Sequence, residues 1–276
     1  MSGKLYLVAT PIGNLEDITL RAIKCLKEVD IIACEDTRHT LKLLNHLDIK
    51  KKLISYHRHN EDTKSFILID LLIDGKNIAL VSDAGTPAIC DPGEEIVKEA
   101  IKKDIEIIPI PGACALINAL IASGMGTTEF AFYGFLPLNK KNRQNKLEHI
   151  KNEAKTVILY EAPHKLINTL KDIQKVRGDD TNIVLAKELT KIHENFIRGK
   201  IKEIVDSLCD IKGEFIIIIE ANLNVNLNNN NDNILSLDEL YKKYELEGFN
   251  KKDIIKKIAK VKNVNKNEIY QYFLYK

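Results

Sequence analysis

The sequence predicts an α/β protein made of two α/β domains and a small C-terminal helical module. Short apolar runs alternate with helical segments through the first 124 residues. Turn residues and a charged run interrupt this pattern between residues 124 and 143, and an asparagine-rich stretch follows the second half. We therefore expect four parts: a first domain over residues 1–124, a second over 125–222, a linker over 223–235 and a helix-turn-helix-like tail over 236–276.

The first domain is expected to hold a mostly parallel sheet covered by helices. Its strands are predicted over residues 4–9, 30–34, 52–56, 77–83 and 105–110. Its helices are predicted over residues 18–29, 40–47, 60–75, 94–103 and 113–123, the last ended by Gly124. Strands that alternate with helices in this way build parallel sheets, which bind ligands beyond the carboxyl ends of their strands.

The second domain has a different pattern, which favours a mixed sheet. One aromatic strand is expected within residues 124–144, and further strands over 156–163, 182–189, 194–199 and 213–221. Only two helices are evident between them, over 164–175 and 200–208.

The C-terminal tail is expected to form three helices. Ser236 and Glu239 have the spacing of a capping box, and Asn250 and Asn265 are further N-cap candidates. The predicted core of this module is Leu237, Leu240, Ile254, Ile255, Ile258, Ile269 and Phe273.

Charge and composition exclude several classes of protein. The net charge is +2, but ten lysines against six acids from Asn233 onward give the tail +4 and leave about −2 for the rest. The five cysteines have no CxxC or Cys/His spacing, so neither a disulfide framework nor a metal site is expected. No apolar run approaches the roughly 18 residues of a membrane helix and no leader is evident, so we expect a cytoplasmic protein without membrane contact.

Distinctive turns follow four of the predicted strands. They read ATPIGN, CEDTR, SDAGTP and PIPGACA, two of them with acids and three with a glycine that permits close approach to a ligand. The GxGxxG and GxxxxGK[ST] patterns of dinucleotide and P-loop sites are absent. A nucleotide polyphosphate is therefore not the expected ligand.

Together with FYGFLP, YEAPHKL and AKELTKIHE, these turns resemble the tetrapyrrole methylase superfamily. Within it, the ordered set is most similar to the branch that 2′-O-methylates a cytidine of small-subunit ribosomal RNA. The resemblance covers residues 3 to about 220, and the basic tail is similar to the C-terminal helical appendage of that branch.

The resemblance implies that S-adenosylmethionine binds in a cleft between the two domains of a homodimer. It places ten residues at the cofactor: Pro11, Ser82, Asp83, Ala84, Ile89, Cys114, Ala115, Phe135, Tyr160 and Leu189. In SDAGTPAICDPG, we assign Asp83 to the cofactor and interpret Asp91 as a residue that starts the next helix.

Methyl transfer to a ribose hydroxyl needs in-line placement and removal of a proton. Candidates for this work are Glu35, Asp36, Arg38, Glu161 and Lys187. Asp36 with Arg38 could instead be an ion pair at a helix start. Lys187, at the end of a buried strand, could be a base of lowered pKa or the partner of Glu161 in a salt bridge.

An RNA substrate needs phosphate contacts from lysine and arginine. Candidates are Lys51, Arg58, Lys141 and Arg143, although lysine runs are also common on solvated surfaces. The resemblance thus implies a methyltransferase that modifies a cytidine in the decoding region of 16S rRNA, free or in the 30S particle. Alternatives are a methylase of a uroporphyrinogen- or precorrin-type tetrapyrrole and a non-catalytic RNA-binding protein.

Overall fold

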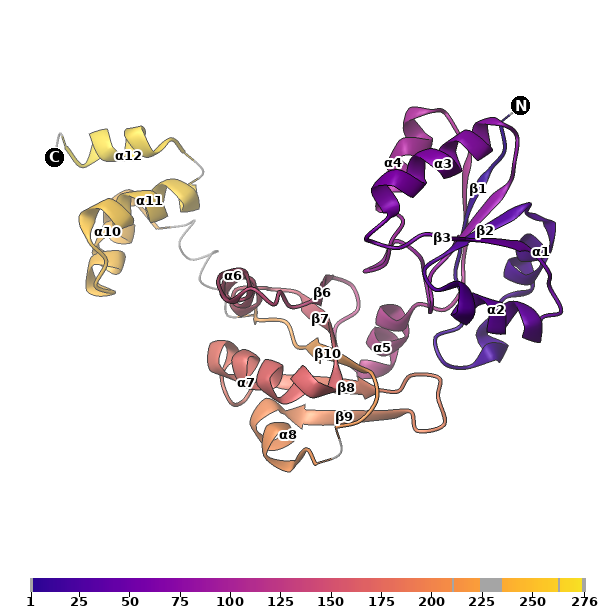
Figure 1. Cartoon of the computed structure of the whole chain (residues 1–276). Coiled ribbons are helices and arrows are strands. Elements are labelled where there is room, and N and C mark those ends of the chain that lie inside the picture. The colour runs from indigo at the N-terminus through magenta and orange to yellow at the C-terminus, as the bar shows by residue number, and fades with distance from the viewer. Residues whose placement is uncertain (1, 210, 224–234, 263, 275–276) are drawn as a thin grey trace.

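The computed structural model describes residues 2–209, 211–223, 235–262 and 264–274, and it contains two five-stranded sheets followed by a group of helices (Figure 1). Most of the predicted linker, residues 224–234, lies outside the described residues. No helix in the described ranges is long and apolar enough to cross a membrane.

The first sheet is parallel throughout, with strand order β3-β2-β4-β1-β5. Its strands are β1 (Leu5–Val8), β2 (Ile31–Cys34), β3 (Lys52–Ser55), β4 (Ile78–Val81) and β5 (Ile107–Ile110). Its helices are η1 (Leu15–Asp17), α1 (Leu20–Glu28), α2 (Thr37–His46), α3 (Glu61–Ile73) and α4 (Glu94–Lys102). The prediction of a parallel, helix-covered sheet is confirmed.

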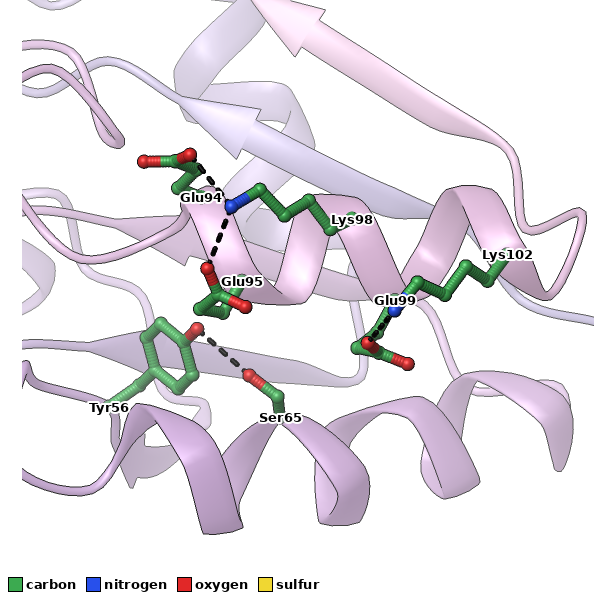
Figure 2. A network of polar contacts seen from close by, with 7 residues as sticks. All are labelled: Tyr56, Ser65, Glu94, Glu95, Lys98, Glu99 and Lys102. Atoms are coloured by element: carbon green, nitrogen blue, oxygen red, sulfur yellow. Dashed lines mark hydrogen bonds and ion pairs between the residues drawn. The ribbon is translucent and has the colours of Figure 1, made fainter.

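Each face of the first sheet is covered by one pair of helices (Figure 1). Apolar residues of α3 and α4 pack on one face, and those of α1 and α2 pack on the other. Figure 2 shows polar contacts on the face of the sheet that α3 and α4 cover. The Tyr56 hydroxyl lies 3.0 Å from that of Ser65, both buried, while Lys98 pairs with Glu94 and Glu95 on the outside of α4. The buried pair ties the end of β3 to α3, and the exposed pairs only support α4 itself.

The second sheet is mixed, as expected, with strand order β6-β7-β10-β8-β9. Its strands are β6 (Phe130–Phe135), β7 (Thr156–Glu161), β8 (Asn182–Lys187), β9 (Asn195–Lys200) and β10 (Phe215–Ile219). β6 and β7 are parallel, and the other neighbours are antiparallel. Its helices are α5 (Ala115–Ser123), α6 (Lys140–Lys151), η2 (Pro163–Lys165), α7 (Leu166–Arg177) and α8 (Ile201–Ser207).

Two features of this half differ from the pattern that the sequence suggested. The run Lys140–Arg143 is not a boundary segment, because it begins α6, which Asn139 caps and which buries Leu147 and Ile150. In addition, α5 packs Leu116, Ala119 and Leu120 on the second sheet, although the sequence placed this helix in the first domain. We therefore propose a boundary between β5 and α5 rather than at residue 124.

Three helices make up the C-terminal module: α10 (Leu237–Leu246), α11 (Lys251–Lys262) and α12 (Lys266–Tyr272). The predicted capping box at Ser236 is formed. Five of the seven predicted core residues are buried, Leu237 and Phe273 pack at the margin, and Tyr244 and Ala259 complete the core. The module therefore has a hydrophobic core of its own.

Candidate active site

One cavity of about 390 Å³ lies where turns of the first sheet face the second sheet. Turns after β1, β4 and β5 form one wall, and the ends of β6, β7, β8 and β10 form the other. Such a volume suits a small ligand or cofactor. The lining residues are Ile12, Asp83, Ala84, Gly85, Thr86, Ile89, Cys90, Asp91, Cys114, Ala115, Phe135, Tyr160, Glu161, Ala162, Pro163, Ala186, Leu189, Glu214, Phe215 and Ile216.

The turn after β4 is shaped by hydrogen bonds within the first sheet. Backbone groups of Thr10 and Gly85 exchange two hydrogen bonds, of 2.9 and 3.0 Å, which join the turns after β1 and β4. The hydroxyl of Ser82, buried under this turn, lies 3.3 Å from the carbonyl oxygens of Ala84 and Gly85. Ser82 therefore supports the turn and does not itself line the cavity.

Eight of the ten predicted cofactor residues line the cavity: Asp83, Ala84, Ile89, Cys114, Ala115, Phe135, Tyr160 and Leu189. The other two, Pro11 and Ser82, lie directly beside lining residues. The structure thus brings together residues that are up to 106 positions apart, from Asp83 to Leu189. Their roles toward a cofactor stay a prediction.

Aromatic side chains build the wall formed by the second sheet. The Tyr160 ring packs edge-on against Phe132 and Phe135, with ring centroids 4.9 and 5.7 Å away. Its hydroxyl accepts a hydrogen bond of 3.2 Å from the Leu116 N–H at the start of α5. Burial raises the pKa of Tyr160 strongly, so the phenol is neutral at physiological pH.

Asp91 lines the cavity, contrary to its interpretation as a helix-start residue. The N-cap of α4 is Gly93, and no side chain caps this helix. Burial and the neighbouring carboxylate of Glu35 raise the pKa of Asp91 to about 6. The sequence signal was ambiguous, because an aspartate before Pro-Gly and a helix is also typical of a helix start.

The predicted catalytic residues of the turn after β2 do not line the cavity. The Asp36 carboxylate caps α2 and pairs with Arg38 at 2.8 Å. This confirms the alternative of an ion pair at a helix start. The hydrogen bonds from Arg38 hold the pKa of Asp36 well below its usual range. Glu35 is half-buried, and burial and nearby Asp83 raise its pKa. The Asp36 N–H donates to Asp83 Oδ1 at 3.0 Å, so this turn positions Asp83.

The two candidates from the second sheet differ in placement. Glu161 lines the cavity and is 4% exposed; its carboxylate accepts hydrogen bonds from the Ala162 N–H at 2.8 Å and the Thr169 hydroxyl at 2.5 Å. Lys187 is half-buried, with its amino group 5.9 Å from the ring centroid of Phe215, and does not itself line the cavity. This placement gives no support to Lys187 as the base.

The predicted RNA contacts fall into two groups. Arg58 and Lys141 are exposed, and Arg58 donates to the carbonyl oxygen of Cys90 at the edge of the cavity. Lys51 instead donates to the Val29 carbonyl at 2.6 Å. This contact lies next to the start of β2, at the edge of the sheet opposite to the cavity. Arg143 is half-buried and pairs with Asp172 at 2.8 Å, which makes it an internal residue of the second domain.

Several lining residues were not predicted. Some of them lie inside the turn motifs quoted above, beside residues that were predicted, and this proximity could have indicated them: Ile12, Thr86, Cys90, Ala162 and Pro163. Phe215 and Ile216 belong to β10, an apolar run without a distinctive motif, and Glu214 directly precedes this strand. Their position became visible only with the order of the second sheet, in which β10 is the central strand.

Comparison with known proteins identifies the family. The model of the Tetrapyrrole (Corrin/Porphyrin) Methylases matches residues 4–205. The chain is 51% identical over 274 residues to ribosomal RNA small subunit methyltransferase I of Halalkalibacterium halodurans, covering 98% of this chain and 94% of that protein. It is 46% identical over 275 residues to the protein of the same name from Bacillus subtilis, with 98% and 94% covered.

Solved structures show the same fold at low sequence identity. Uroporphyrin-III C-methyltransferase from Thermus thermophilus, complexed with S-adenosylhomocysteine, has a TM-score of 0.57 at 16% identity, covering 79% of this chain and 97% of that one. A diphthine synthase has a TM-score of 0.63 at 14% identity, covering 79% and 90%. From its fold, its strand-end motifs and these matches, the chain belongs to the tetrapyrrole methylase family.

Proposed function

We propose that the protein transfers a methyl group from S-adenosylmethionine to small-subunit ribosomal RNA. One observation carries this proposal: the chain resembles the ribosomal RNA small subunit methyltransferases I over nearly its whole length. The likeness extends into the basic module beyond the family domain. The cavity, formed at the strand ends where the family resemblance places the cofactor, supports it.

The residues of the cavity fit the two ends of such a cofactor. Ile89, Phe135 and Leu189 offer apolar surface to an adenine ring. Asp83 and Asp91 offer carboxylates to an amino group and a sulfonium. When bound, the cofactor supplies an activated methyl group, and the walls around it exclude water and fix the direction from which an acceptor oxygen approaches.

We further propose the ribose 2′-hydroxyl of a cytidine in the decoding region of 16S rRNA as the acceptor, in free RNA or in the 30S particle. Methyl transfer breaks the carbon–sulfur bond, forms a carbon–oxygen bond and releases the hydroxyl proton. Exposed Arg58 and Lys141 are the candidates for phosphate contacts. A homodimer, acting in the cytoplasm where ribosomes assemble, belongs to the same proposal.

The test supplies radiolabelled S-adenosylmethionine together with either undermethylated 30S subunits or a uroporphyrinogen-type tetrapyrrole. Label in a cytidine of 16S rRNA is expected, and digestion to nucleosides shows whether it is on the 2′-oxygen. Label only in the tetrapyrrole would show the alternative enzyme. Binding of RNA without label in either substrate would show a non-catalytic RNA-binding protein.

A matched pair of variants on one helix tests the cavity. Ala115→Phe fills the cavity and should lower the rate at least about tenfold, because the ring occupies the space of the ligand. Ala122→Phe adds the same ring to an exposed position of α5 and should leave the rate nearly unchanged. Equal rates for the two variants would place the reaction elsewhere.

A further inference from the structure

The charges of the cavity wall are strongly one-sided. Four carboxylates line it, those of Asp83, Asp91, Glu161 and Glu214, and no lysine or arginine is among the described residues that do so. A wall of this kind favours a ligand with net positive charge. S-adenosylmethionine has this charge, since its sulfonium and ammonium outweigh its carboxylate, whereas the thioether product has none.

Three of the four carboxylates are hydrogen-bonded, ion-paired or exposed to solvent. Asp83 accepts the Asp36 N–H at 3.0 Å, and Glu161 is held by two hydrogen bonds. Glu214 is largely exposed and lies 3.2 Å from the amino group of Lys191. These contacts compensate or screen the negative charges of all three.

Asp91 is in a different electrostatic environment. Burial disfavours its charge most, the carboxylates of Glu35 and Asp83 repel it, and the nearby Ser82 hydroxyl and the charge of Arg58 only partly compensate. The Arg58 guanidinium is engaged with the backbone oxygen of Cys90. Tyr160 and Cys90 also face this charge, and burial raises the pKa of both, which keeps them neutral.

The loop holds Asp91 in this position at a conformational cost. Ala88 and Cys90 have φ values of 66° and 63°, in the left-handed region that residues with a side chain avoid. A Cβ on Gly93 would lie 3.0 Å from side-chain atoms of Ala88 and Leu80, so the turn behind Asp91 is tightly packed. The backbone therefore fixes a carboxylate at the wall where its own charge is poorly compensated.

We propose that Asp91 recognises the positive charge of the methyl donor and lets the site prefer the donor over its neutral product. This inference rests on the proposed function and concerns a residue that was interpreted from the sequence as a helix start. The arriving sulfonium compensates the carboxylate and favours its ionised form, so one proton leaves for solvent when the donor binds at mildly acidic pH. Methyl transfer removes the sulfonium charge, and the product then loses this attraction.

The experiment measures affinities for S-adenosylmethionine and S-adenosylhomocysteine by titration calorimetry between pH 5 and 8, in buffers of different ionisation enthalpy. For the native protein, affinity for the donor should increase as pH rises through about 6, with proton release on binding below that pH. Asp91→Asn should bind the donor on the order of tenfold more weakly, bind the product almost normally and lose the proton release.

Asp104→Asn is the matched control, because Asp104 is an exposed aspartate beyond the other end of α4 and has a φ of 52° that asparagine tolerates. It should bind both ligands like the native protein. Thermal unfolding checks that the Asp91→Asn variant is folded: its melting temperature at pH 7 should be equal or higher, because a poorly compensated buried charge is removed.

The possible results separate the role of Asp91 from the proposed function. Equal weakening of donor and product, or an unchanged pH dependence in Asp91→Asn, overturns the role of Asp91 and leaves the proposed function intact. Failure of the native protein to bind either ligand overturns the cofactor assignment itself.

Discussion

At the scale of single residues, the carboxylate of Glu161 is held in place by a chain of polar contacts. Thr169, which is fully buried, donates to Glu161 and accepts a hydrogen bond of 2.8 Å from Arg143. Arg143 also contacts Asp172 through two nitrogens, at 2.9 Å from Nε and 2.8 Å from Nη2. The chain runs from the surface of α6 and α7 to the cavity, so these residues position Glu161.

Thr169→Val tests this arrangement with almost no change of shape. The valine leaves Glu161 Oε2 and the Arg143 guanidinium without their shared partner, so the free energy of unfolding should decrease by about 1–3 kcal/mol. Urea unfolding followed by circular dichroism measures it. Thr63→Val is the control, because its exposed hydroxyl donates only to the Asn60 carbonyl, and it should change stability by less than about 0.5 kcal/mol. Similar values for both variants would contradict the positioning role.

Residues of the site could be predicted where they follow strands in distinctive turns. Asp83, Ala84 and Ile89 were found in this way. The role of Arg143 could not be predicted, because its partner Asp172 is 29 residues away and a run of basic residues resembles a solvated surface. Local sequence indicates which side chains a turn places at the end of a strand. The partner of a charged side chain, in contrast, depends on tertiary packing.

At the scale of elements, the turn after β1 is packed against the loop between β8 and β9. A Cβ on Gly13 would lie 2.6 Å from Lys191 Cγ, 2.7 Å from Thr190 Oγ1 and 2.9 Å from the Leu189 carbonyl oxygen. Ile12 and Leu189, next to this contact, line opposite walls of the cavity. The absence of a side chain at Gly13 thus sets how closely these walls approach.

Gly13→Ala should separate the two walls, because the backbone oxygen of Leu189 cannot move as freely as the end of a side chain. We expect affinity for S-adenosylmethionine, measured by calorimetry, to fall by at least about tenfold. Gly126→Ala provides the control: its Cβ would have an ordinary 3.5 Å contact with Thr156 Oγ1. Native affinity in Gly13→Ala would show that the contact does not define the cavity.

The sequence predicted most strands and helices, and the exceptions have physical reasons. Helix α6 was missed because its first turns are polar and only Leu147 and Ile150 are buried. The apolar run ended by Gly124 indicated the helix α5, but it could not show which sheet this helix covers. Strand β10 was predicted, but antiparallel pairing on both sides, which makes it central, is a property of the whole sheet.

At the scale of the whole molecule, charge is divided between parts with separate functions. The cavity lining is acidic, which suits a cationic cofactor but not a nucleic acid. The tail carries an excess of four positive charges, and Lys252, Lys256 and Lys260 are exposed at intervals of four residues along α11. Residues spaced in this way lie on one side of a helix, opposite the buried Ile254 and Ile258. We therefore expect α11 to contact RNA phosphates.

Replacing Lys252, Lys256 and Lys260 together by glutamine should weaken binding to undermethylated 30S subunits and make it less dependent on salt. If each lysine neutralises one phosphate, the slope of log affinity against log salt should decrease in magnitude by about 2. Binding at several KCl concentrations measures this slope, while calorimetry should show unchanged affinity for S-adenosylmethionine. All three side chains are exposed and the core of the C-terminal module is unchanged, so the fold of this module should persist.

The control replaces three other exposed lysines, Lys27, Lys171 and Lys175, which lie on α1 and α7. It removes the same net charge, so a general electrostatic attraction would weaken equally in both triple variants. A larger change in salt slope for the α11 variant would assign the phosphate contacts to the module. Equal slopes would show that the basic tail acts only through net charge, and the RNA-binding surface would then have to be sought around Arg58 and Lys141, on the parts that carry the cavity.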